Sequence, residues 1–195
     1  TARPGETTAI IGSTGCGKST LIHLIPRFYD VTAGAITIDG IDIRELSKNK
    51  VRSILGFVPQ KGVLFSGTIE SNIKFGGDWI TDEAMKSAAE VAQAVEFIET
   101  KKDTYRSPIA QGGTNVSGGQ KQRLSIARAI AKNPKVFLFD DSFSALDYKT
   151  DVVLRRALKE KVSDAAVIIV AQRISTILHA DQIIVLDEGR VAGIG

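Results

Sequence analysis

The chain carries Gly12-Ser13-Thr14-Gly15-Cys16-Gly17-Lys18-Ser19-Thr20, and this stretch decides its fold. It matches the pattern Gly-x-x-x-x-Gly-Lys-Ser/Thr in full and follows a short apolar run, Thr7–Ile11, that predicts a buried strand. Glycines permit a tight loop whose N–H groups surround an anion at a helix N-terminus. All nine residues are therefore candidate nucleotide-binding residues. We expect Lys18 to reach the β- and γ-phosphates and the Ser19 hydroxyl to ligate Mg²⁺.

A second apolar run supports this interpretation. Val136-Phe137-Leu138-Phe139 is followed by Asp140, as in a buried strand that ends in a carboxylate. Such an aspartate holds the Mg²⁺ shell opposite the serine of the phosphate loop. Four apolar residues before an aspartate are a weak signal alone, but together with Gly12–Thr20 they indicate a magnesium–nucleotide site.

The rest of the chain predicts an α/β fold. Strand and helix patterns alternate at both ends, which favours a mainly parallel sheet in a P-loop NTPase (RecA-like) core. From about residue 62 to 133 the pattern is mostly helical, which predicts an inserted α-helical subdomain. We thus expect one domain over 1–195, with a core of 1–61 and 134–195 and a helical subdomain of 62–133. The helices expected are Lys18–Arg27, Leu46–Arg52, Asp82–Gln93, Ser117–Lys132, Lys149–Lys161 and Arg173–His179.

Composition excludes several other classes of protein. Lys and Arg exceed Asp and Glu by 25 − 22 = +3, and the charges are scattered, so no nucleic-acid partner is expected. The single cysteine, Cys16, excludes a disulfide framework within the chain. The longest apolar run, Ala165–Ala171, is far shorter than the roughly 20 residues of a membrane-spanning helix. Both ends of the sequence look cut, so we read the chain as a domain excised from a longer protein.

One motif gives a family resemblance. Val116-Ser117-Gly118-Gly119-Gln120 resembles the LSGGQ signature of ATP-binding-cassette (ABC) proteins. Gln60 then looks like the family's Q-loop glutamine, which acts at the γ-phosphate and on Mg²⁺. Ser144-Ala145-Leu146-Asp147 looks like the D-loop, and Gln172 stands at the switch position. The resemblance covers essentially the whole chain and implies the ABC ATPase fold.

Other segments suggest the subtype. Leu64–Ile73, Pro26–Asp30 and Val185–Gly189 are similar to exporter cassettes, whose cassette is joined to transmembrane helices. The resemblance implies a place at the cytoplasmic face of the cell membrane. It also implies contacts with transmembrane domains through the Q-loop region and the helical subdomain.

The resemblance also implies a second cassette as partner. In this family two cassettes pack head to tail around two ATP molecules, and each signature closes over the phosphate loop of the other. Val116–Gln120 and Asp147 would therefore contact the partner's ATP. Ser117, Gly118 and Gly119 stand at a helix N-terminus, where they can offer donors to a γ-phosphate.

Two departures from the family pattern concern catalysis. Asp141 replaces the glutamate that polarises the attacking water, and Gln172 replaces the switch histidine. Losing a methylene moves a carboxylate back by about 1.5 Å, and a misplacement near 1 Å costs on the order of 10²-fold in rate. The pair resembles the degenerate-site half of a heterodimeric exporter. ATP binding is expected to persist, because Lys18, Ser19 and Asp140 remain.

Several alternatives stay open at this point. Asp141 and Gln172 can be tolerated variants in an active homodimer. The chain can be a regulatory ATP clamp that does not hydrolyse ATP, or a soluble cassette ATPase of DNA repair or chromosome packing. The last would need long coiled-coil insertions between the two halves, and the pattern from 62 to 133 is compact.

Overall fold

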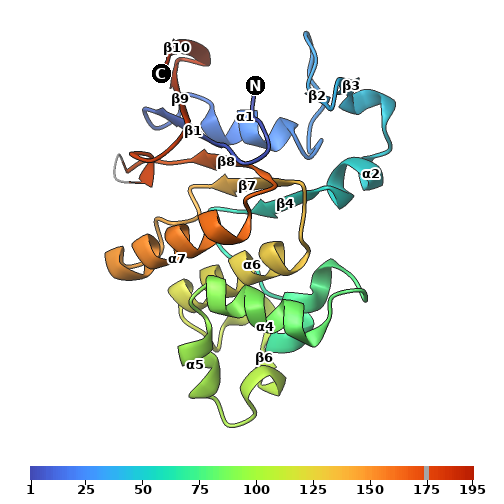
Figure 1. Ribbon diagram of the computed structural model, residues 1–195, viewed down its shortest axis with the longest axis vertical. Helices are drawn as coiled ribbons and strands as arrows, with labels where there is room; N and C mark the ends of the chain where they lie inside the picture. The colour runs from blue at the N-terminus through green and yellow to red at the C-terminus, as the bar shows by residue number, and fades with distance from the viewer. Residues whose placement is uncertain (174–175) are drawn as a thin grey trace. The chain divides into compact units, whose positions relative to one another are not determined.

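The chain forms two compact units in a computed structural model that describes residues 1–173 and 176–195 (Figure 1). The first unit contains residues 1–57, 134–140 and 165–195. The second contains residues 58–133 and 141–164. The domain boundaries expected from the sequence, at 62 and 133, stay a prediction.

The first unit is built on a six-stranded sheet in the order β10-β9-β1-β8-β7-β4. Strand β1 pairs in parallel with β8 and β9, and β7 pairs in parallel with β8. Strand β10 pairs antiparallel with β9. The mainly parallel α/β sheet predicted from the sequence is thus confirmed. The strands are β1 (Thr7–Gly12), β4 (Leu55–Val58), β7 (Val136–Asp140), β8 (Ala166–Val170), β9 (Gln182–Asp187) and β10 (Arg190–Ile194).

Helix α1 (Lys18–Leu24) packs its buried residue Ile22 into the core of this unit. The helix ends before Arg27, where the sequence prediction had placed its end. Pro26 has no N–H to continue the helical hydrogen bonds, and Arg27 adopts a left-handed conformation with φ of 54°. The core combines residues from strands and helices, namely Ile10, Cys16, Ile22, Ile43, Val51, Leu55, Leu138, Val170 and Leu186.

A small hairpin lies between α1 and the next helix. Strands β2 (Thr37–Ile38) and β3 (Ile41–Asp42) pair antiparallel and form a sheet of their own. The turn between them uses Asp39 and Gly40, both at positive φ, as a two-residue hairpin turn requires. Helix α2 (Lys48–Ser53) follows, and the Ser47 side chain caps its N-terminus.

The second unit is mainly helical. Its helices are α3 (Ile69–Ile73), α4 (Asp82–Val91), α5 (Val95–Glu99), α6 (Gly118–Ala131) and α7 (Tyr148–Lys161). Helix α6 packs against α3 and α4, and α4 also packs against α7. Thr81 caps α4 by accepting a hydrogen bond from the Ala84 N–H. A two-stranded sheet of β5 (Gly67–Thr68) and β6 (Pro108–Ile109) was not predicted.

Short 3-10 helices complete the described structure, at Ile43–Glu45, Lys74–Gly76, Thr104–Arg106 and Gln111–Gly113. The helix expected over Arg173–His179 includes residues 174 and 175, which lie outside the described residues. Within the described ranges, no helix combines the length and apolar character needed to cross a bilayer.

Candidate nucleotide-binding site

The loop Gly12–Thr20 joins β1 to α1 and opens the helix at Lys18. Gly12 cannot be replaced by a residue with a side chain without displacement, because a Cβ there would lie 2.1 Å from the Leu186 carbonyl oxygen. Gly17 occupies the N-cap position of α1 with φ of 100°. The glycines thus let the backbone turn tightly in front of the helix N-terminus, where N–H groups face an anion.

The Lys18 side chain lies within its own loop. Its ammonium donates to the carbonyl oxygens of Gly12 at 2.8 Å and Ser13 at 2.7 Å. A third, longer contact of 3.6 Å reaches Cys16 Sγ, and Cys16 is buried. The positive charge is therefore already positioned inside the loop that the sequence assigned to phosphates.

Ser19 and Asp140 meet although 121 positions separate them in the sequence. The Ser19 hydroxyl donates to Oδ1 of Asp140 at 2.9 Å, and Asp140, the last residue of β7, is 4% exposed. A hydroxyl oxygen beside a carboxylate is the kind of oxygen ligand set that Mg²⁺ takes together with nucleotide phosphates. The residues present therefore fit a magnesium–nucleotide complex.

His23, which no motif singles out, is a further neighbour of Asp140. His23 Nε2 lies 3.2 Å from Oδ2 of Asp140, the oxygen that Ser19 does not contact. A signal was available, because Ser19 and His23 are four residues apart and so share one face of α1.

In the second unit the structure brings Gln60 and Asp141 together. The Gln60 amide donates to Oδ2 of Asp141 at 3.1 Å. Asp141 is 7% exposed, has φ of 47°, and its carbonyl oxygen accepts the Ser144 hydroxyl at 2.8 Å. Gln60, the expected Q-loop glutamine, and Asp141, the expected replacement for a catalytic glutamate, are thus direct neighbours.

The signature-like residues Val116–Gln120 form the start of α6. Ser117 and Gln120 make a capping box: the Ser117 hydroxyl accepts the Gln120 N–H at 3.2 Å, and Oε1 of Gln120 accepts the Ser117 N–H at 3.0 Å. Ser117 and Gly118 are exposed, and a Cβ placed on Gly118 would meet nothing within 4 Å. The N-terminus of α6 is therefore exposed at Ser117 and Gly118.

Asp147 caps the N-terminus of α7. Its carboxylate accepts the Thr150 N–H at 3.0 Å and the Thr150 hydroxyl at 2.7 Å. The hydrogen bond from the Thr150 backbone and that from its side chain lower the pKa of Asp147. Its expected contact with a partner's ATP stays a prediction.

Gln172 follows β8 and is exposed in a bend of the chain. Its expected contact with the γ-phosphate also stays a prediction. Two pairs of predicted site residues are therefore in contact. Ser19 of the loop Gly12–Thr20 contacts Asp140 in the first unit, and Gln60 contacts Asp141 in the second.

The sheet and the loop define a class of protein. A parallel sheet that carries Gly12–Thr20 between β1 and α1, with Asp140 paired to Ser19, is the arrangement of the P-loop NTPases. The sequence model of the family described as "ABC transporter" matches residues 1–144. The chain belongs to that family and is an ATP-binding domain of it.

Similar proteins support this assignment. An ABC transporter ATP-binding protein of Mycobacterium tuberculosis is 51% identical over 100% of this chain and 34% of its own length. A putative multidrug export ATP-binding/permease protein of Staphylococcus aureus is 44% identical over 98% of this chain and 33% of its own. The chain thus spans about one third of the length of these relatives.

The fold is also similar to a solved structure, that of a bacterial Atm1-family ABC exporter with ATP bound. The TM-score is 0.95 at 40% identity, over 100% of this chain and 34% of that one. The predicted ABC ATPase fold is confirmed. The named relatives are transporter proteins, which favours the exporter over the DNA-repair cassette that the sequence left open.

Proposed function

We propose that this chain is the ATP-driven motor domain of an exporter, and that it converts Mg·ATP binding and hydrolysis into substrate export. One observation carries the proposal: Lys18 Nζ is held inside the phosphate loop, and Ser19 and Asp140, the residues expected to hold Mg²⁺, are hydrogen-bonded to each other. When bound, Mg²⁺ neutralises phosphate charge as it develops. Gly12–Thr20 supplies the N–H groups and Lys18 the ammonium for the phosphates.

The chain's own site would turn over ATP slowly. Asp141 would take the place of the water-polarising residue, with Gln60 and Gln172 completing the contacts to the γ-phosphate. Two observations support this part of the proposal: Asp141 has the shorter acidic side chain, and its carboxylate is bonded to Gln60. Gln172 can donate a hydrogen bond but cannot become cationic as histidine can.

The partner would be a second cassette, as one half of a heterodimer. Val116–Gln120 and Asp147 would complete the partner's ATP site. The capped and open start of α6 supports this role, because helix N-terminal N–H groups attract a phosphate. The parent protein would lie in the cell membrane with this domain on its cytoplasmic face. Transmembrane domains would contact the Q-loop region and the helical subdomain.

Single-turnover hydrolysis of Mg·ATP tests the slow site. The intact protein and its Asp141→Glu, Gln172→His double variant are compared with Lys18→Ala as the binding-deficient control. We expect the double variant to hydrolyse on the order of 10²-fold faster at this site, because a correctly placed carboxylate restores that factor. Equal rates in the unmodified protein and the double variant would contradict the slow site, while loss of ATP binding in both would contradict the proposed function itself.

A further inference from the structure

Asp140 has a contact on each of its two carboxylate oxygens. Ser19 donates to Oδ1 at 2.9 Å, and His23 Nε2 lies 3.2 Å from Oδ2. The Asp140 side chain is 6% exposed and that of His23 is 31% exposed. The second contact is not part of the phosphate-loop motif, and the proposed function does not use it.

The His23 ring is fixed from two sides by aromatic rings. Phe28 meets it edge-on with centroids 5.5 Å apart, and Phe57 does so at 5.6 Å. Phe28 and Phe57 also contact each other at 5.4 Å. Edge-to-face pairs of this kind favour one ring orientation over others. The ring therefore presents Nε2 to Asp140 in a defined direction.

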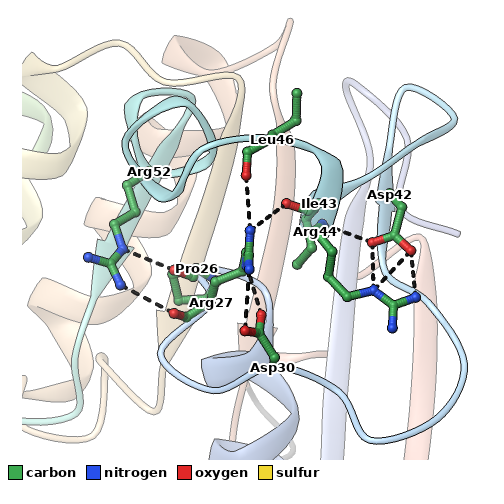
Figure 2. Close-up of polar contacts among 8 residues, drawn as sticks. All are labelled: Pro26, Arg27, Asp30, Asp42, Ile43, Arg44, Leu46 and Arg52. Atoms are coloured by element: carbon green, nitrogen blue, oxygen red, sulfur yellow. Dashed lines mark hydrogen bonds and ion pairs between the residues drawn. The ribbon is translucent and has the colours of Figure 1, made fainter.

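Two arginines, Arg27 and Arg52, fix the turn at residues 26–27, directly before Phe28 in the sequence (Figure 2). Arg52 donates to the carbonyl oxygens of Pro26 at 3.1 Å and Arg27 at 3.2 Å, and its guanidinium lies 5.5 Å from the Phe28 ring centroid. Arg27 donates to the carbonyl oxygens of Ile43 at 3.0 Å and Leu46 at 2.9 Å, and it pairs with Asp30. The turn is thereby tied to the segment that precedes α2.

We infer that His23 is a positioning residue for the magnesium site: it holds Oδ2 of Asp140, so that the carboxylate keeps one orientation when Mg·ATP binds. The inference rests on the proposed function. With a proton on Nε2, the ring presents an N–H donor to the carboxylate.

The two partners of the Asp140 carboxylate respond differently when the metal binds. The Ser19 hydroxyl has a second task, because it is expected to ligate the metal, so its bond to Oδ1 must adjust when the metal arrives. His23 has no such task and can keep Oδ2 in place throughout. Partners that orient a metal-binding carboxylate without touching the metal typically change metal affinity by about 10- to 100-fold when removed.

Nucleotide binding to the intact protein, rather than its activity, tests this role. The ATP dissociation constant is measured with Mg²⁺ and with EDTA, and the ratio of the two reports how much the metal adds to binding. His23→Phe keeps an aromatic ring but removes the donor, and His23→Gln restores a donor without a ring. His179→Phe is the matched control, because His179 is exposed and is the other histidine of the chain.

Mg²⁺ raises the affinity for ATP by a certain factor, which we call the Mg²⁺-dependent gain. For His23→Phe we expect this gain to fall about tenfold, while the ATP affinity in EDTA stays unchanged. His23→Gln should recover most of the gain, and His179→Phe should leave it intact. An unchanged gain in His23→Phe would overturn the inference. So would an equal loss in both His23 variants, or an equal loss with and without Mg²⁺, since each would show that ring packing alone matters. If the unmodified protein binds no Mg·ATP, the proposed function fails as well.

Discussion

Replacement of Arg128 by methionine is expected to destabilise the second unit strongly. Arg128 lies on α6, and its guanidinium donates at 2.8 Å to three oxygens: the carbonyls of Asn72 and Val63, and Oδ1 of Asn72. Its charged group is also within 5.1 Å and 5.4 Å of the ring centroids of Phe65 and Phe75. Burial lowers the pKa of Arg128 to about 10, which still leaves the guanidinium charged at neutral pH.

The expected magnitude follows from these contacts. A hydrogen bond from a charged group contributes about 1.5–3 kcal/mol, and the two bonds to Asn72 are the partly buried ones. The bond to Val63 is exposed, and water replaces it at little cost. Removing a charge also returns its desolvation penalty, which offsets part of the loss. The net destabilisation is therefore about 3 kcal/mol, near the upper end for single substitutions.

Urea unfolding followed by the fluorescence of Trp79 measures this loss. Trp79 is the chain's one tryptophan and belongs to the second unit, so its signal reports on that unit. Arg156→Met is the matched control: Arg156 is on α7 of the same unit, 84% exposed, and pairs with Glu160 at 3.5 Å. We expect it to cost less than about 0.5 kcal/mol. A loss below about 1 kcal/mol in Arg128→Met would refute the reasoning, because buried charge-assisted bonds would then be worth no more than exposed ones.

Three further substitutions, in two experiments, test single features. Asp147→Asn should reduce the loss of folding stability at acid pH. The pKa of Asp147 in the folded protein lies below its ordinary value of 3.8. Its carboxylate therefore stabilises the fold above pH 3.8, and this stabilisation is lost as the pH falls through the folded pKa. Acid unfolding followed by circular dichroism checks this, and an unchanged acid limb would contradict it. Gly12→Ala should destabilise the fold by about 3 kcal/mol or more, because the new Cβ would clash with the Leu186 carbonyl oxygen. Gly15 also has a positive φ, of 85°, but a Cβ there would meet no atom within 4 Å, so Gly15→Ala should cost only about 1 kcal/mol. Equal losses in thermal unfolding would show that backbone strain alone decides both.

Much of the fold followed from local patterns in the sequence. The strongest signals were the glycine and lysine spacing of Gly12–Thr20 and the apolar runs of β1, β7 and β8. Each of them predicts one loop or strand over its whole length. The β5–β6 pair was missed because two-residue strands, separated by about 40 positions, leave no periodic pattern. The end of α1 was misplaced because helical spacing was followed past Pro26.

The contacts of the candidate site were likewise predicted only in part from the sequence. Ser19 and Asp140, which two separate motifs named, are hydrogen-bonded to each other, but the His23 contact depends on where the sheet places the end of β7 relative to α1. The contact of Gln60 with Asp141 likewise joins residues 81 positions apart. Neither can be read from spacing alone, because a contact of high sequence separation depends on tertiary packing.

The contacts of Lys18 have a consequence for how a nucleotide is received. An ammonium has three N–H groups, and here two donate to carbonyl oxygens while the third faces a thiol at 3.6 Å. Sulfur is a weak acceptor, so we expect an arriving phosphate oxygen to replace the thiol before it replaces either carbonyl oxygen. On that expectation Lys18 would exchange one of its three neighbours and keep the other two when ATP binds.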